Sequence, residues 1–145
     1  MSEYKNPRYP TEEDRAVWQN RARAKQLIAF RNMKRDRHIT PTDIDGLIEA
    51  RDENAVVFYE FKYRDTEMPK GQRMALEELV DSLEKSGKSA VAFLCSHDVT
   101  DPNEDVDAAE AEVTKIYMHR KWFPGRGRTC REETDRFLAW AGGQR

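Results

Sequence analysis

Residues 56–63, VVFYEFKY, constrain the fold most strongly, because six of these eight residues are apolar or aromatic. A short run rich in β-branched and aromatic residues predicts a β-strand. Successive side chains of a strand point to opposite faces, so Glu60 and Lys62 must share one face with Val56 and Phe58. We therefore expect a carboxylate and an amine side by side on a partly apolar sheet face.

The residues before this strand predict an antiparallel partner. Residues 38–50 alternate in the manner of a strand, and RDEN at 51–54 is a turn signal. A hairpin whose turn is centred within RDEN places Asp45 opposite Glu60, with Cβ atoms about 5 Å apart. Two opposed carboxylates repel each other unless something neutralises them, and a hard divalent cation would do so.

A purely structural interpretation of the same hairpin stays open at this stage. In the same register Asp43 lies opposite Lys62, and the two would form an ordinary cross-strand ion pair on a solvent-facing surface. Val56 and Phe58, on the face of Glu60, argue against a fully solvated face.

Helices and strands alternate along the rest of the chain. The expected elements are a helix over 10–33 with Thr11 and Asp14 as its capping box, the hairpin, a helix over 72–87, strands over 89–96 and 113–122, and a last helix from Thr129 to about Ala141. Residues 98–112 are expected to be an acidic loop or short helix, and residues 123–128 a loop. This order predicts an α/β or α+β fold.

Charge is unevenly distributed, although the formal net charge is only −2. Residues 1–37 carry ten Lys/Arg against five Asp/Glu, residues 98–112 carry seven acids and no Lys/Arg, and residues 113–131 carry six Lys/Arg and no acid. Such segregation favours a polyanionic partner. Cys95 and Cys130 lack CxxC spacing, so neither a disulfide framework nor a zinc site is expected.

The motif TDIDG followed fourteen residues later by EFK resembles the PD-(D/E)XK nuclease superfamily. The resemblance covers about half of the chain and matches Asp45 to the metal-binding acid, Glu60 to the second acid and Lys62 to the lysine. Gln72 resembles a glutamine that some branches place beside the site. The implied fold is a restriction-endonuclease-like core, a central mixed sheet with an antiparallel hairpin flanked by helices.

The resemblance implies a Mg²⁺-dependent endonuclease, with Mn²⁺ as a possible substitute, that hydrolyses DNA phosphodiester bonds. Asp45, Glu60 and the carbonyl of Phe61 would hold the metal, while Lys62 would orient the attacking water. The nearest likeness is to compact junction-resolving or phage-type repair nucleases, which suggests branched or recombination intermediates as substrates. The alternative is a non-catalytic DNA-binding or host-factor-inhibiting protein on the same fold, and an RNA-directed nuclease is a weaker option.

Two departures from the family pattern leave assignments open. The expected first helix has no Glu within residues 15–30, where Gln19 or Gln26 would have to stand in. Pro41 lies four residues before Asp45 but two before Asp43, so Asp43 is a rival for the first acid.

Residues 119–128, HRKWFPGRGR, interleave cations with aromatic rings, a composition that suits contact with a nucleic-acid backbone and stacking on bases. The residues expected to bind nucleic acid are Arg120, Lys121, Trp122, Arg126 and Arg128. A basic surface loop with its aromatic rings in the core is an equal alternative. His97 ends a predicted strand and is expected to be structural.

The chain is expected to be one domain over residues 1–145, with a basic C-terminal extension from about residue 113. No apolar run approaches 18 residues and no signal-peptide core stands near Met1, so we expect a soluble cytoplasmic protein of a bacterium or phage-infected cell, with no membrane partner. A homodimer is possible, since cutting both strands of a duplex favours two-fold symmetry.

Overall fold

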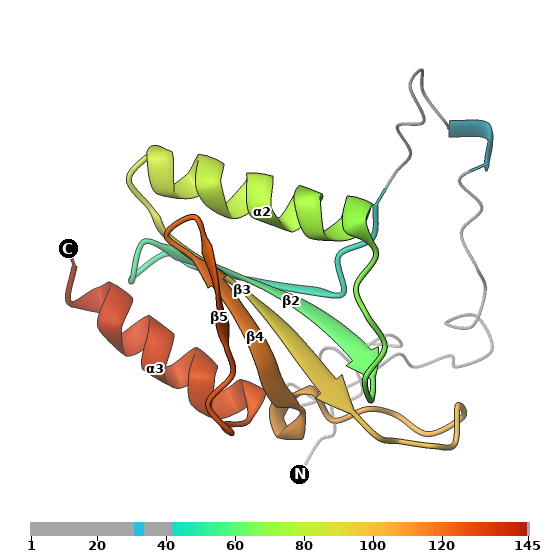
Figure 1. Cartoon of the computed structure of the whole chain (residues 1–145). Helices are drawn as coiled ribbons and strands as arrows, with labels where there is room; N and C mark the ends of the chain where they lie inside the picture. Colours follow the sequence, from blue (N-terminus) through green and yellow to red (C-terminus); the bar gives the residue numbers. More distant parts are fainter. Residues whose placement is uncertain (1–30, 34–41, 145) are drawn as a thin grey trace, which may run out of the picture. The chain divides into compact units, whose positions relative to one another are not determined.

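The computed structural model describes residues 31–33 and 42–144 (Figure 1). The chain divides into two units, residues 1–41 and 42–145. In the first unit only Arg31–Met33 is described, as a single 3₁₀ turn, η1. The rest of the helix expected over 10–33 lies outside the described residues, together with its capping box, Gln19 and Gln26.

The second unit is built on a five-stranded mixed sheet in the order β1-β2-β3-β4-β5. The elements are β1 (Gly46–Ala50), β2 (Ala55–Tyr63), α2 (Lys70–Lys85), β3 (Ser89–His97), η3 (Ala108–Glu110), β4 (Glu112–Met118), β5 (Lys121–Pro124) and α3 (Cys130–Gly142). β2 and β3 pair in parallel, and the other neighbouring strands are antiparallel. The expected α/β layout with a mixed sheet and an antiparallel hairpin is therefore confirmed.

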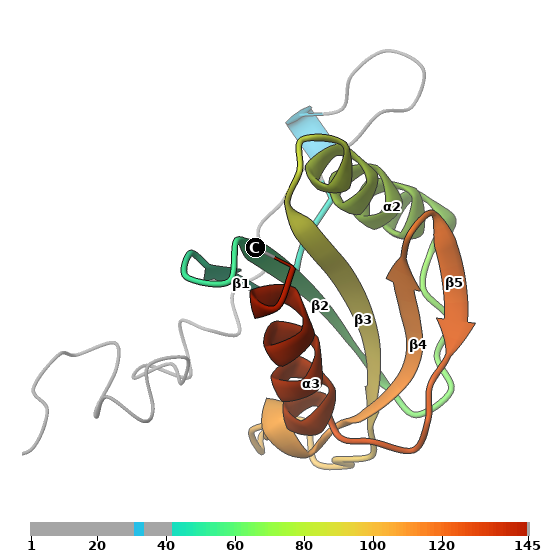
Figure 2. The same cartoon turned by 90° about the vertical axis from the view of Figure 1, so that its left-hand side faces the viewer.

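The two helices cover opposite faces of the sheet (Figure 2). Val56 and Phe58 of β2 pack with Leu76 and Val80 of α2 in one buried cluster. Tyr59 and its odd-numbered neighbours in β2 pack in a second cluster with residues of α3. The alternation of β2 thus serves two cores, which explains why its apolar run is nearly continuous.

The α2 crossover joins the parallel strands β2 and β3. Its apolar stripe predicts the face that packs on the sheet, and Leu76 and Val80 are indeed buried. The helix ends in a Schellman arrangement, in which Lys88 N–H donates to Leu83 O and Gly87 N–H donates to Glu84 O, both at 3.0 Å. Gly87 has φ +98°, which a residue with a side chain rarely adopts.

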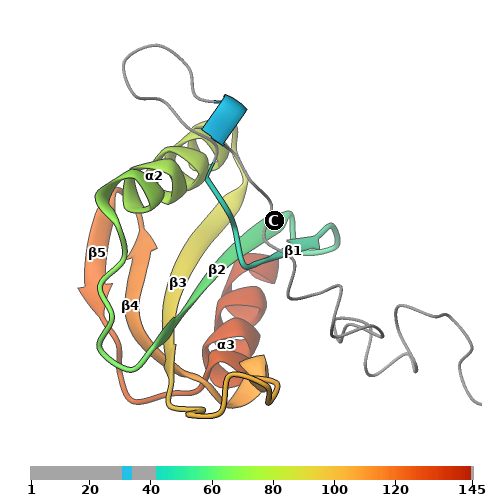
Figure 3. The same ribbon diagram turned by 90° about the vertical axis from the view of Figure 1, so that its right-hand side faces the viewer.

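The predicted hairpin register is confirmed, because Gly46 pairs with Tyr59 and Ala50 with Ala55. The predicted extent of the first strand is wrong: β1 begins at Gly46, and residues 42–45 are not in a strand. Aspartate is a poor strand former, and Asp45 uses its side chain rather than its backbone to meet β2. β1 forms an edge of the sheet (Figure 3).

The single strand expected over 113–122 is also wrong, because the chain reverses at His119 and Arg120 to form the β4–β5 hairpin. Both turn residues have positive φ, 52° and 63°, as a type I′ turn requires. Neither is Gly or Asn, so the usual signal is absent from the sequence. Glu84 of α2 holds the turn, accepting from His119 N–H at 3.0 Å.

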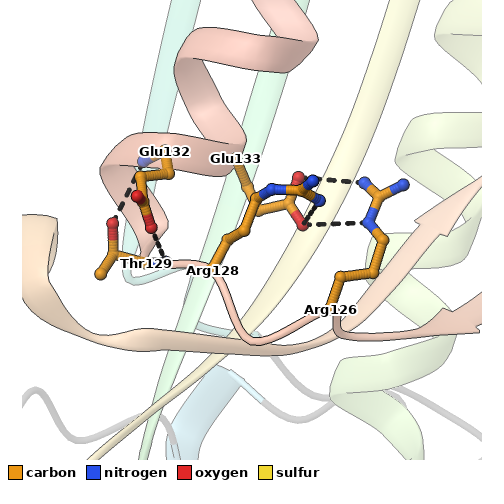
Figure 4. Close-up of polar contacts among 5 residues, drawn as sticks. All are labelled: Arg126, Arg128, Thr129, Glu132 and Glu133. Carbon is orange, nitrogen blue, oxygen red and sulfur yellow. Dashed lines mark hydrogen bonds and ion pairs between the residues drawn. The ribbon is translucent and has the colours of Figure 1, made fainter.

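Residues 113–144 supply β4, β5 and α3, and so belong to the sheet and its second covering layer. The capping box predicted at the start of α3 is confirmed: Glu132 N–H donates to Thr129 Oγ1, and Thr129 N–H donates to Glu132 Oε1 (Figure 4). Among the described residues, neither helix combines the length and apolar character needed to cross a bilayer.

Candidate active site

Asp45 meets β2 directly. Its Oδ2 accepts a hydrogen bond from Phe61 N–H at 2.8 Å, although its own backbone lies just outside β1. In an extended strand the N–H and C=O of one residue point to the same neighbour, so the Phe61 carbonyl also faces this edge. The exposed carboxylate of Asp45 and the carbonyl of Phe61 thus lie on the same side of β2.

Glu60 is a buried carboxylate, only 2 % exposed, on the same face as the α2 core. Lys62 Nζ contacts its Oε2 at 2.9 Å, so the amine and the carboxylate lie side by side on this face, and Lys62 pairs with Glu60. The other oxygen, Oε1, is buried without a hydrogen-bond partner among the described residues. An unpartnered buried carboxylate oxygen is costly, and a cation relieves that cost.

Burial raises the pKa of Glu60 above its ordinary value. The hydrogen bond from Lys62 opposes this shift, and the nearby carboxylate of Asp45 adds to it. The two acids therefore share one electrostatic environment, as the hairpin register predicts.

Gln72, in the first turn of α2, reaches back towards the hairpin. Its Nε2 donates to the backbone carbonyl of Asp43 at 3.3 Å, and its Oε1 is buried without a described partner. Asp43 contacts Gln72 through its main chain while Asp45 contacts β2 through its carboxylate. This difference favours Asp45 as the first acid of the site.

Within the part of the chain that the structure describes, no group of three or more His, Cys, Asp or Glu side chains is placed to hold a metal ion. The donors at this edge are two carboxylates, Asp45 and Glu60, and the main-chain carbonyl of Phe61. Mg²⁺ is commonly held in proteins by one or two carboxylates, with waters and phosphate oxygens filling its remaining positions. The donor set fits such an ion.

A groove of about 920 Å³ opens beside this site, with Lys62 in its lining. We call it the β5 groove. Its lining comes from Lys62 of β2, 94–96 of β3, 114–115 of β4, 122–124 of β5, 64–68 of the connection, and Lys70 and Arg73 of α2. Five cationic and two anionic side chains line it, an excess of three positive charges in a chain of net charge −2.

The residues expected to bind nucleic acid lie in several places. Trp122 lines the β5 groove, but its Nε1–H donates to Glu77 at 2.6 Å and its ring packs on Tyr117. Lys121 lies over the ring of Phe123, 5.4 Å from its centroid. Arg120 occupies the β4–β5 turn and lines a separate, smaller pocket.

Arg126 and Arg128 both engage a carboxylate of their own chain (Figure 4). Arg126 donates from Nε and Nη2 to Glu133 at 3.3 and 3.0 Å, and Arg128 Nη1 lies 3.8 Å from the same side chain. Glu133 is 2 % exposed, so this contact ties the loop before α3 to the helix. These arginines have a structural role that the sequence did not predict.

His97 lies on the opposite face of the sheet from Lys62, since it pairs with Tyr63 and packs edge-on against its ring. Its Nδ1 accepts from Val99 N–H at 3.2 Å, in keeping with the expected structural role.

Four cations of the β5 groove were not singled out from the sequence: Arg64, Lys70, Arg73 and Lys115. They are dispersed over three elements, and only the fold gathers them. Of these four cations, only Arg64 could have been suspected from the sequence, because it follows Lys62 by two residues.

Comparison of the chain with models of known protein families, with curated proteins and with solved structures gave no match.

Proposed function

We propose that the protein is a Mg²⁺-dependent nuclease that hydrolyses phosphodiester bonds in DNA. The observation that carries the proposal is the proximity of the Asp45 and Glu60 carboxylates at the edge of β2, beside Lys62, which itself lines a basic groove. A restriction-endonuclease-like core, with this hairpin followed by a crossover helix bearing Gln72, is part of the proposal.

Asp45, Glu60 and the Phe61 carbonyl would hold the ion. When bound, a divalent cation polarises the phosphate and lowers the pKa of a coordinated water. Glu60 is suited to this role because one of its oxygens has no hydrogen-bond partner among the residues that the structure describes, and because its raised pKa falls when a cation approaches.

Lys62 supplies the charge that faces the substrate. Its ammonium is fixed by Glu60 at 2.9 Å and its side chain is 19 % exposed, so it can contact a phosphate in the groove without leaving its partner. A fixed ammonium stabilises charge that develops on phosphate oxygens during displacement. Gln72 holds the main chain at Asp43 and so positions the segment that carries Asp45.

The test is incubation of purified protein with MgCl₂ or MnCl₂ and a panel of substrates: supercoiled plasmid, linear duplex, branched junctions, single-stranded DNA and RNA of equal length. We expect at least one DNA to be cut, with no cutting in EDTA. Asp45→Asn and Lys62→Met, purified identically, exclude a contaminating nuclease. Absence of cleavage on every DNA overturns the proposal, and binding without cleavage favours the non-catalytic alternative.

A further inference from the structure

The outer side of β1 has no partner strand among the described residues, because the sheet ends with β1 on one side and β5 on the other (Figure 3). An open edge presents backbone N–H and C=O groups that can pair with another chain. β5 carries Lys121 and Pro124, residue types that commonly protect an edge against such pairing. β1 has neither type, and its Leu47 and Ile48 are 54 % and 38 % exposed. Of the two edges, β1 is therefore the one that is open to pairing.

The free backbone groups of the β1 edge belong to Leu47 and Glu49. Phe61 N–H points towards β1, where it donates to the carboxylate of Asp45. Since the N–H groups of successive residues in a strand point to opposite sides, the odd-numbered residues of β2 face β1. The even-numbered residues of β1 pair with these odd-numbered residues and so bond to them. Leu47 and Glu49, which lie between them, direct their N–H and C=O groups outwards.

Two copies of β1 can pair all four of these groups in one antiparallel arrangement. When Ile48 of one copy lies opposite Ile48 of the second, Leu47 of each copy lies opposite Glu49 of the other, and these residues exchange N–H···O bonds. The arrangement has the two-fold symmetry of a homodimer. It also places the two exposed Ile48 side chains against each other, in the closer of the two kinds of antiparallel pair.

The charges at the ends of β1 suit this register. One step beyond each end of the strand, Arg51 of one copy lies opposite Asp45 of the other, so opposite charges face each other at both ends. Glu49 lies 3.4 Å from Arg51 of its own chain, and Leu47, not an acid, lies opposite it in the second copy. Because opposed residues share a face of the sheet, both candidate active sites would open on the same side of the joined sheets.

We propose that two copies of the protein pair through the β1 edge, antiparallel and centred on Ile48, so that the two five-stranded sheets become one. Only five residues on each side take part in the strand pairing, against about 20–30 in a standard interface, so we expect a weak dimer. The inference goes beyond the proposed function, and its test requires neither metal nor nucleic acid.

The first test is disulfide trapping under mild oxidation, in variants that each carry one added cysteine; the two native cysteines are buried. Ile48→Cys places two thiols opposite each other across the two-fold axis, and we expect it to give a covalent dimer. Leu47→Cys, which would lie opposite Glu49, and Glu104→Cys, on an exposed loop, should cross-link at least about tenfold more slowly. Cross-linking of Leu47→Cys as fast as that of Ile48→Cys overturns the register and the inference with it.

The second test is hydrogen exchange by NMR over a range of protein concentrations, with sedimentation velocity on the same samples. The N–H groups of Leu47 and Glu49 should become about tenfold or more better protected as the dimer forms. Ile48 N–H, which is bonded to β2, should be protected at every concentration. Ile48→Lys opposes two like charges at a half-exposed position, so it should fold but lose the dimer. Met74→Lys, at an exposed apolar position of α2, is the matched control and should keep it.

A wild type that stays monomeric at the highest concentration overturns the inference, and the exchange data then identify the reason. Protection of Leu47 and Glu49 in the monomer means that the chain itself fills the β1 edge. Fast exchange of both groups means that the edge is open but does not bind a second copy.

Discussion

The carboxylate of Asp45 accepts a hydrogen bond from the backbone N–H of Phe61, so an acid just before β1 is bonded to the backbone of β2. Asp45→Asn keeps an oxygen for this bond but removes the charge. We expect cleavage to fall by about 100-fold or more while the folded structure persists. Initial cleavage rates and circular dichroism, measured on the same preparations, provide the check.

The rival first acid is tested by the matched variant Asp43→Asn. Asp43 is held through its main-chain carbonyl, which the substitution leaves intact. We expect cleavage within about threefold of the wild type, because Asp43 is not one of the proposed metal ligands and they keep their charge. If Asp43→Asn is inactive and Asp45→Asn is active, the two assignments must be exchanged.

The ionised side chain of Glu60 should lower the free energy of unfolding at neutral pH when no metal is bound. Its pKa is raised in the folded protein, so the folded state holds the proton more tightly than the unfolded state does. Its contribution to the free energy of unfolding therefore falls as the pH rises from about 4.3, the unfolded value, through the folded pKa. Glu60→Gln escapes this loss, so its stability relative to the wild type should rise as the pH rises.

Urea denaturation of wild type and Glu60→Gln in EDTA, from pH 5 to pH 8, measures this difference. The gap should widen with pH and then level off. Glu104→Gln makes the same change on an exposed glutamate and should give no such gap. A difference between wild type and Glu60→Gln that is constant across the range would contradict the raised pKa.

Lys62 lowers the pKa of Glu60, so removing its charge should make ion binding harder as well as slow the chemistry. We expect Lys62→Met to reduce cleavage by about 100-fold at pH 7. Part of this loss should be recovered at higher pH, because a higher pH favours the charged form of Glu60. The measurement is a Mg²⁺ titration of cleavage at pH 7 and at pH 8.5. An apparent Mg²⁺ affinity equal to that of the wild type at pH 7 contradicts the coupling.

The arginines before α3 should matter for stability more than for DNA binding. Arg126→Gln removes two hydrogen bonds to the buried Glu133, and we expect it to lower the free energy of unfolding by about 2 kcal/mol. Lys115→Gln, on an exposed groove residue, should weaken DNA binding and leave the free energy of unfolding unchanged. Paired denaturation and anisotropy measurements decide the matter. An Arg126→Gln protein of unchanged stability but weakened DNA binding would restore the role expected from the sequence.

The sequence predicts the hairpin register, the α2 crossover, β3 and the capped start of α3, because each rests on local turn chemistry or on strict apolar periodicity. It does not predict β5. The turn at His119 and Arg120 has no Gly or Asn, and it depends on Glu84, thirty-five residues away in the chain.

The residues of the candidate site also fall into those that the sequence predicts and those that only the fold brings together. Glu60 and Lys62 lie two residues apart on one face of β2, and the hairpin that pairs Gly46 with Tyr59 brings Asp45 beside them, so residue spacing predicts this cluster. The β5 groove draws its cations other than Lys62 from the connection, α2 and β4, and only the tertiary structure assembles these residues. The same limit explains Arg126 and Arg128, whose partner Glu133 is a buried acid on a helix face that the sequence presents as ordinary.

The most direct measurement is the Mg²⁺-dependent stabilisation of the wild type, Asp45→Asn and Glu60→Gln. It is measured as the melting temperature in thermal unfolding at pH 7.5. Ion binding at the two carboxylates should raise the melting temperature of the wild type with increasing MgCl₂, and each variant should lose most of that response. The same concentrations should switch on DNA cleavage in the wild type alone. Equal stabilisation of all three proteins, or none in the wild type, would contradict the claim that Asp45 and Glu60 share one divalent ion.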